Sequence, residues 1–137
     1  MNTLEEIFNQ YKNIAVLGFS VKHDRASNRI GRYLTMNGFN VFGVNPDVDL
    51  SEIDGIHVHD DLKSLPENVD VINIFRRSEF LYDHVKEILK MDPLPKVIWT
   101  QIGVIDPDAK KLAEENGIQY IENKCIMVEH NKIFYNT

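Results

Sequence analysis

Residues 14–17 form an uninterrupted apolar segment, Ile-Ala-Val-Leu, which ends at Gly18. A continuous apolar run of this length is typical of a strand that is buried on both faces. After a polar loop, apolar side chains recur at helical spacing from Ile30 to Leu34, in a helix that ends near Asn37. A strand, a loop and a helix in this order form the first half of a crossover unit, so we expect a parallel sheet.

The rest of the chain repeats this alternation of apolar runs and helical stripes. We predict further strands at residues 39–44, 56–58, 70–75, 96–100 and 118–121. A helix at residues 3–11 begins with a capping box made by Thr3 and Glu6. Two more helices begin near Ser78, an expected N-cap, and at Asp106-Pro107. The acidic residues 47–55 are predicted to form a loop.

Strands that alternate with helices of about ten residues predict a doubly wound α/β fold. We expect a mostly parallel, Rossmann-like sheet with helices on both faces. The chain is interpreted as a single domain of residues 1–137, with its core at residues 14–121, an N-terminal helix at 3–11 and a C-terminal extension at 122–137. No regular structure is assigned to that extension.

Composition narrows the possible environments and partners. A single cysteine cannot form an internal disulfide, and 15 Lys and Arg against 21 Asp and Glu argue against non-specific binding to duplex DNA. No apolar run reaches the ~20 residues of a membrane span, and the acidic first ten residues do not resemble a secretory signal. We therefore expect a cytoplasmic protein that binds neither nucleic acid nor membranes.

Polar, glycine and cationic residues follow the predicted strands. In open α/β sheets, ligands bind in the crevice beyond the carboxyl ends of the strands, so these residues are the candidate site. They are Gly18, Phe19 and Ser20 after the first strand, Asn45 and Pro46 after the second, Phe75, Arg76 and Arg77, then Gln101, Ile102 and Gly103, and finally Cys125.

The first of these loops has the chemistry of an anion site. Gly18 lets backbone approach a ligand closely, while Ser20 and Ser27 offer hydroxyl groups beside the first N–H groups of a helix. Lys22 and Arg25 add positive charge, as do Arg76 and Arg77 on the neighbouring loop. Taken alone, the glycine only turns the chain and the adjacent arginines form a solvated face. Together they predict a ligand that carries phosphate groups.

The motifs of other phosphate-binding folds are absent. The dinucleotide fingerprint G-x-G-x-x-G fails because Ser20 stands two residues after Gly18. Asn45-Pro46 stands where an acidic residue would hold the ribose of NAD. The P-loop motif G-x-x-x-x-G-K-[ST] is also missing. The sequence therefore fits NAD and P-loop chemistry poorly.

The ordered motifs resemble those of the small stand-alone CoA-binding proteins, which are similar to the CoA-binding domain of the succinyl-CoA synthetase alpha subunit. The resemblance covers about residues 14–130 and rests on Gly18-x-Ser20 with Lys22, Arg25 and Ser27, Val44-Asn45-Pro46, Phe75-Arg76-Arg77-Ser78-Glu79, Trp99-x-Gln101-x-Gly103-Val104, and Lys124-Cys125-x-x-x-Glu129-His130. One departure is His23, where relatives commonly carry proline.

The resemblance implies coenzyme A as the ligand and gives the loops their roles. Gly18, Ser20, Arg25 and Ser27 would hold the diphosphate and the neighbouring phosphate. Asn45 and Pro46 would border the adenosine. The path of the remaining part of the ligand would be lined by Phe75, Arg76, Ile102 and Gly103.

No catalytic residue and no metal ligand is predicted. A synthetase-type ligase needs a phosphorylatable histidine and a nucleotide-grasping domain, which we do not expect in 137 residues. His57 and His59 lack a convincing third metal ligand. Cys125 and His130 would point to opposite faces of an extended segment. Lys124 beside Cys125 permits a mixed disulfide with the ligand thiol, although a buried cysteine is favoured.

The leading hypothesis is that the chain binds coenzyme A or an acyl-CoA without chemistry of its own, as a carrier, a sensor or a regulatory partner. Two alternatives stay open. One is a nucleotide- or NAD-dependent enzyme with a degenerate fingerprint. The other is a protein-interaction module that uses the acidic residues 47–54 or the C-terminal tail. The sequence identifies no protein partner.

Overall fold

The computed structural model describes residues 1–135 and contains a seven-stranded sheet in the order β3-β4-β2-β1-β5-β6-β7. All neighbouring strands pair in parallel except β3 and β4, which are antiparallel. The strands are β1 (Asn13–Leu17), β2 (Asn40–Val44), β3 (Glu52–Ile53), β4 (Ile56–His59), β5 (Val71–Ile74), β6 (Val97–Thr100) and β7 (Gln119–Ile121). The doubly wound, mostly parallel sheet predicted from the sequence is confirmed.

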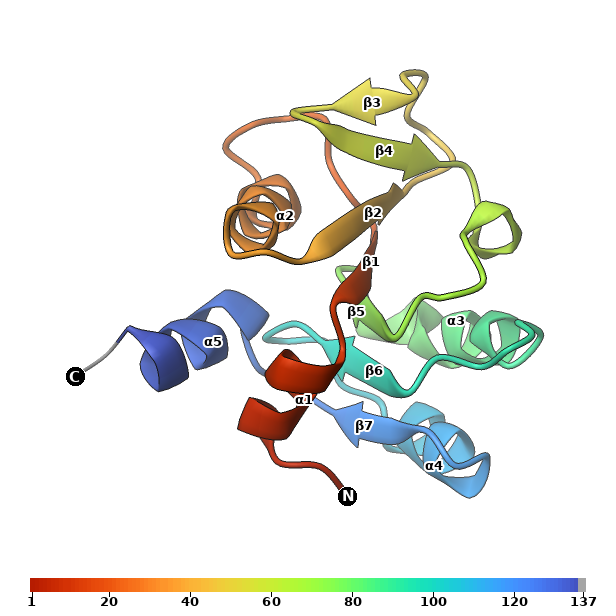
Figure 1. Cartoon of the computed structure of the whole chain (residues 1–137). Helices are drawn as coiled ribbons and strands as arrows, with labels where there is room; N and C mark the ends of the chain where they lie inside the picture. Colours follow the sequence, from red (N-terminus) through yellow and green to blue (C-terminus); the bar gives the residue numbers. More distant parts are fainter. Residues whose placement is uncertain (136–137) are drawn as a thin grey trace.

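Helices cover both faces of this sheet (Figure 1). They are α1 (Leu4–Gln10), α2 (Ala26–Met36), α3 (Ser78–Ile88), α4 (Pro107–Glu115) and α5 (Ile126–Phe134), with a short 3-10 helix, η1 (Leu62–Ser64), before β5. Side chains alternate across β1, so Ile14 and Val16 join the core beneath α1, α2 and α5. Ala15 and Leu17 join the core beneath α3 and α4.

The strand order reverses at β1. This strand pairs with β2 on one side and with β5 on the other. From β1 the chain first adds strands on the β2 side and then crosses over to add β5, β6 and β7 on the other side, so the connections run in opposite directions from the β1–β5 pair. Ligands of open α/β sheets bind at such a point, beyond the carboxyl ends of the strands. The residues that follow β1 and β5 are Gly18 and Phe75.

Two helices begin at the N-cap residues that were predicted from the sequence. The Thr3 hydroxyl accepts the Glu6 N–H at 3.2 Å, and the Glu6 carboxylate accepts the Thr3 N–H at 2.8 Å, which is the reciprocal capping box. Asp106 caps α4 by accepting the Asp108 N–H, with Pro107 as the first helical residue.

Ser78 does not cap α3, so that prediction is wrong. The cap residue is Arg77, and Ser78 is the first residue of the helix. The Ser78 hydroxyl instead donates to the Gly103 carbonyl at 3.1 Å and accepts the Ile105 N–H at 2.8 Å. The loop after β6 passes this helix end and offers both groups to the hydroxyl. Ser78 therefore ties two loops at the carboxyl edge of the sheet together.

The acidic segment 47–55 is not a loop throughout, which corrects the sequence interpretation. Glu52 and Ile53 form β3, which pairs with β4 in a hairpin. Asp54 and Gly55 make the turn with φ of 52° and 82°. Both angles are positive, as in the type I′ turns that Asp-Gly favours between antiparallel strands.

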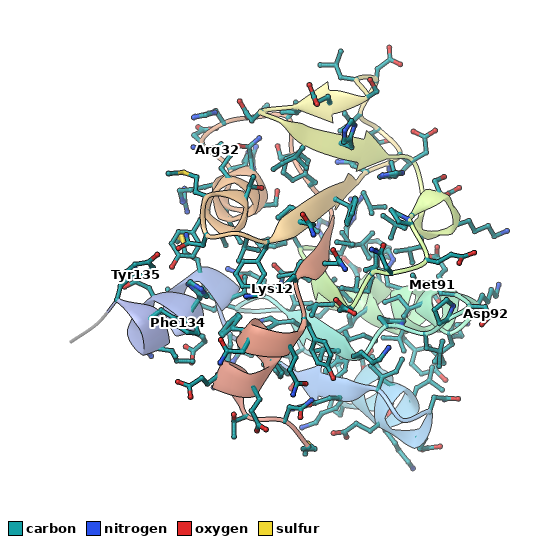
Figure 2. All side chains as sticks on the ribbon, in the orientation of Figure 1. Lys12, Arg32, Met91, Asp92, Phe134 and Tyr135 are labelled. Atoms are coloured by element: carbon teal, nitrogen blue, oxygen red, sulfur yellow. The ribbon has the colours of Figure 1, made fainter. Side chains whose placement is uncertain are left out.

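The C-terminal extension contains a helix that was not predicted from the sequence. Helix α5 packs against α1 and α2. Cys125 is its N-cap residue, and the chain from Ile126 through His130 is helical rather than extended. Phe134 and the following Tyr135 lie at the outer end of this helix (Figure 2). The ring of His130 packs against Phe8 and shares a 2.8 Å hydrogen bond with the Tyr33 hydroxyl. Burial there lowers the pKa of His130.

Candidate functional site

The turns that follow β1 and β5 touch each other. Gly18 has a φ of +92°, and a Cβ atom placed on it would lie 2.5 Å from the Phe75 carbonyl oxygen and 3.3 Å from Arg76 Nε. A side chain at this position would therefore collide with the neighbouring backbone and strain its own. The prediction that the Gly18 and Arg76 turns lie on one side of the molecule is confirmed.

Backbone hydrogen bonds join the other loops to this contact. The Gly18 N–H donates to the Val44 carbonyl at 2.8 Å, which fixes the start of the first loop beside the end of β2. The Gln101 N–H donates to the Ile74 carbonyl at 3.2 Å, and the Lys124 N–H donates to the Thr100 carbonyl at 3.2 Å. The segments that follow β1, β2, β5, β6 and β7 therefore form one continuous rim.

Phe19 anchors the first loop from beneath. Its side chain is fully buried, and its ring atoms lie 2.9 Å and 2.7 Å from where a Cβ would stand on Gly31 and Gly43. The two glycines therefore make the space that the ring occupies. The Phe19 side chain faces the core and not the rim, so only the backbone of this predicted site residue lies at the rim. Its role is to hold the cationic loop (residues 19–25) onto the sheet.

Both serine hydroxyls of the candidate anion site accept hydrogen bonds from backbone N–H groups of the cationic loop. The Ser27 hydroxyl accepts the Ser20 N–H at 3.0 Å, and the Ser20 hydroxyl accepts the Lys22 N–H at 3.1 Å. Arg25 is the N-cap residue of α2 and makes no side-chain cap. The first-turn N–H groups of α2 therefore have no cap from that side chain, and exposed Lys22 and Arg25 stand beside them.

Asn45 connects the second loop to the first. Its amide nitrogen donates to the Phe19 carbonyl at 2.8 Å, and its amide oxygen accepts the Asp47 N–H at 2.9 Å. Both halves of the amide are thus engaged in bracing the rim. Pro46, the next residue, is exposed and offers an apolar edge at the same place.

The two adjacent arginines differ in their surroundings. Arg77 is exposed, and its guanidinium lies 3.6 Å from the Glu79 carboxylate. Arg76 is half-buried, and its buried Nε has no hydrogen-bond partner among residues 1–135. The buried Oε1 of Gln101 is likewise unpaired within the described part of the chain. Buried polar atoms are nearly always hydrogen-bonded, so these two at the rim mark a place that a polar ligand would complete.

The loops after β6 and β7 are held together by Asn123, which lies just beyond the last predicted strand but is given no role in the predicted ligand site. Asn123, at a φ of 61°, accepts the Gly103 N–H at 2.7 Å, and its own N–H donates to the Thr100 hydroxyl. Ile102 is left 64% exposed at the tip of its loop. Asparagine tolerates the left-handed region, so an asparagine two residues after a strand was the signal in the sequence for this turn.

Cys125 lies in the core rather than on the open rim. It is only 7% exposed, and it packs in the same apolar cluster as Ile121 and Ile126. Lys124, beside it, is exposed. The thiol is therefore poorly placed for the predicted ligand contact, and the sequence-based preference for a buried cysteine is confirmed.

The two histidines of β4, His57 and His59, each contact a neighbouring side chain. His57 lies 3.9 Å from the Glu52 carboxylate, and the ring of His59 packs edge-on against Phe42. Among residues 1–135, no group of three His, Cys, Asp or Glu side chains is arranged to hold a metal ion. The same residues include no helix that is both long enough and apolar enough to span a membrane.

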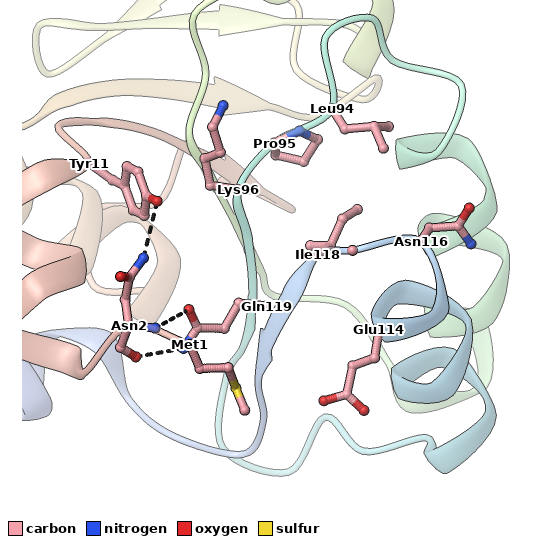
Figure 3. Close-up of a pocket in the computed structure, with 11 residues that line it drawn as sticks. Met1, Asn2, Tyr11, Leu94, Pro95, Lys96, Glu114, Asn116, Ile118 and Gln119 are labelled. Atoms are coloured by element: carbon pink, nitrogen blue, oxygen red, sulfur yellow. Dashed lines mark hydrogen bonds between the residues drawn. The ribbon is translucent and has the colours of Figure 1, made fainter.

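A hollow of about 710 Å³ lies at the opposite, amino-terminal edge of the sheet (Figure 3). Asn2 and Gln119 exchange two hydrogen bonds there, and Asn2 also donates to the Tyr11 hydroxyl. The charged side chains that line the hollow are Lys96 and Glu114, which oppose each other in sign. This hollow lacks the concentration of cations found at the rim, so we place the candidate site at the rim.

Comparison with known proteins shows the family to which the chain belongs. The model of a family described as a CoA binding domain matches residues 12–131. The chain belongs to this CoA-binding domain family. Among its relatives is an uncharacterized Bacillus subtilis protein, YneT, which is 34% identical over 127 residues, covering 93% of this chain and 91% of the relative.

Solved structures of the same fold include both small proteins and part of a large one. A Thermus thermophilus structure matches with a TM-score of 0.89 and 34% identity, covering 97% of this chain and 100% of that one. An acetyl-coenzyme A synthetase from Ca. Korarchaeum cryptofilum, solved with phosphate and ADP, matches with a TM-score of 0.69 and 25% identity. That match covers 88% of this chain but 27% of the synthetase, so the fold of this CoA-binding family member also occurs within a larger protein.

Proposed function

We propose that this member of the CoA-binding domain family binds coenzyme A or an acyl-CoA along the carboxyl edge of its sheet. The observation that carries the proposal is the contact of Gly18 with Phe75 and Arg76 where the strand order reverses. It brings the cationic loop and a half-buried arginine to one point of the rim. Parallel sheets bind nucleotide ligands at this point.

The chemistry of the rim matches the parts of coenzyme A. Its phosphate groups need cations and free N–H groups, which Lys22, Arg25, Arg76 and the first turn of α2 supply. Exposed Pro46 gives the adenosine an apolar edge. The pantetheine arm carries amide N–H groups, and the unpaired Oε1 of Gln101 is an acceptor of the kind that such a group requires.

We further propose that the protein binds its ligand without reacting with it. Cys125 is buried, and His130 is held by the Tyr33 hydroxyl and by aromatic rings, so neither presents a nucleophile or a base to the rim. A carrier, a sensor or a regulatory partner of CoA-dependent enzymes fits this arrangement. A cytoplasmic location remains a prediction from composition.

Native mass spectrometry of freshly purified protein tests the proposal, because a ligand that co-purifies is identified by its mass. Thermal unfolding with added ligand is the second arm. A ligand at ~100 times its dissociation constant stabilises a protein by about 2.7 kcal/mol. We expect that shift with CoA and none with NAD. Stabilisation by NAD alone would indicate a nucleotide-dependent enzyme instead, and no response to either would indicate an interaction module.

A further inference from the structure

We propose that Asn28 and Asp54 are positioning residues that set the shape of the cationic loop. In this view the β3–β4 hairpin takes part in ligand binding without touching the ligand. The inference rests on the proposed function, because it concerns how the ligand-free loop is held ready for CoA. Asn28 lies within a helix and Asp54 follows β3, the antiparallel edge strand, so neither belongs to the rim formed by the parallel strands, and neither is among the predicted site residues.

Asn28 lies in the first turn of α2 and is completely buried. Its amide nitrogen donates to the Ser20 carbonyl at 2.9 Å and to the Asp54 carboxylate at 3.3 Å. A buried amide without partners would be costly, so these bonds fix where Ser20 lies relative to the helix. Ser20 is the residue whose N–H and hydroxyl organise the start of the cationic loop.

The other half of the Asn28 amide controls the far end of the loop. Its oxygen accepts a hydrogen bond from Arg32 Nε at 2.8 Å, and Arg32 Nη2 donates to the His23 carbonyl at 2.7 Å. Figure 2 shows Arg32 on α2, in the region between this helix and the β3–β4 hairpin. One buried side chain thus restrains the loop at two positions, residues 20 and 23.

Asp54 brings the hairpin into the same network. It occupies the turn at a φ of 52°, and its carboxylate lies 3.4 Å from the His23 ring as well as accepting from Asn28. The carboxylate therefore touches both the loop and the residue that restrains it. Lys22 and Arg25 are exposed and carry charges of the same sign, so we expect the loop to sample more conformations without this brace. Ordering it on binding would reduce affinity for the anionic ligand.

The decisive variant is Asp54→Gly, because glycine accepts the positive φ of the turn while removing the carboxylate. We expect the dissociation constant for CoA to rise about tenfold, as for the loss of hydrogen bonds to a charged group. Asp54→Asn keeps an acceptor and tolerates the same backbone angle, so its affinity should stay within about threefold of the parent. Asp49→Gly, in the same exposed acidic segment, is the matched control for charge and is expected to bind like the parent.

Two further measurements separate positioning from a general loss of stability. Hydrogen exchange of the ligand-free protein should accelerate at residues 20–25 in Asp54→Gly while the strands of the sheet keep their protection. In a double-mutant cycle, Asn28→Ala combined with Asp54→Gly should weaken binding no more than the stronger single variant, because both break one network.

The inference is overturned if the parent binds CoA and Asp54→Gly binds it equally well, or if the two substitutions weaken binding additively. Failure of the parent to bind CoA is a separate result that removes the proposed function. The positioning role then stands or falls on hydrogen exchange alone, and unchanged exchange at residues 20–25 in Asp54→Gly would remove it.

Discussion

The backbone of Gly18 lies directly against the carbonyl oxygen of Phe75, so close that a Cβ atom on Gly18 would stand 2.5 Å from that oxygen. This contact joins the ends of the two strands at which the order of the sheet reverses. It leaves room for backbone only, and it brings Arg76 Nε to the edge of the cationic loop. The proposed ligand site depends on this close contact between Gly18 and Phe75.

A methyl group at position 18 should therefore damage both folding and binding. Gly18→Ala combines a collision with the strain of a positive φ, so we expect a loss of more than about 2 kcal/mol in the free energy of unfolding and no measurable binding of CoA. Gly38→Ala is the matched control, because Gly38 has a φ of +89° but a Cβ atom on it would have no neighbour within 4 Å. Denaturant unfolding of both variants gives the comparison, and equal losses would show that the collision is unimportant.

The two adjacent arginines should differ in their effect on affinity. Arg76→Ala removes the half-buried guanidinium whose Nε is unpaired in the described residues, so we expect CoA binding at least about tenfold weaker. Arg77→Ala removes an exposed side chain paired with Glu79 and should change affinity by less than about threefold. Calorimetric titration measures both. A greater loss for CoA than for dephospho-CoA places Arg76 at the 3′-phosphate, and equal losses place it at the diphosphate.

The stability of the protein should fall as the solution becomes mildly acidic. Burial, and then the charge of Lys12, lower the pKa of His130 below its ordinary value of 6.5, and burial lowers the pKa of His84 in the same direction. The unfolded chain then binds more protons than the folded one below about pH 6.5, so the free energy of unfolding decreases as the pH falls through that region.

Urea unfolding between about pH 5 and pH 8 measures this dependence. His130→Gln and His84→Gln should each flatten part of the decline, because each removes one of the two shifted groups. Stability that stays constant or increases toward pH 5 would contradict the account of how α5 is held on α1 and α2.

The thiol of Cys125 should be protected while the protein is folded. It is 7% exposed within an apolar cluster, so a thiol reagent is expected to label it only on unfolding. Intact mass of protein purified without reductant should equal the mass of the chain. An adduct with the mass of CoA would show instead that the ligand thiol reaches Cys125 and forms a mixed disulfide.

The parts of this fold that local patterns specify were predicted correctly. The apolar runs before Gly18, Asn45 and Arg76 are strands, and the capping residues Thr3 and Asp106 begin helices, because burial on both faces and cap hydrogen bonds leave direct signatures in the sequence. Since parallel strands end at one edge, the loops of the rim could also be placed together from the sequence alone.

The missed parts depend on contacts between distant residues. The two buried positions of α5 are Ile126 and His130, and the histidine interrupts the apolar pattern by which the helix would be recognised in the sequence. Strand β3 is two residues long and exists only through its pairing with β4, although the Asp54-Gly55 turn was a usable signal. The side-chain directions of Phe19 and Asn45 follow from tertiary packing, so sequence reasoning placed them at the rim without revealing that they brace it.

The proposed function requires coenzyme A to bind at the carboxyl edge of the sheet, and titration of the 15N-labelled protein, followed by amide chemical shifts, reports this binding residue by residue. We expect added CoA to move the amide signals of Gly18, Ser20, Arg76 and Gly103, while those of Asn2, Gly117 and Gln119 around the opposite hollow stay in place. Shifts confined to that opposite edge, or no shifts at all, would contradict the account.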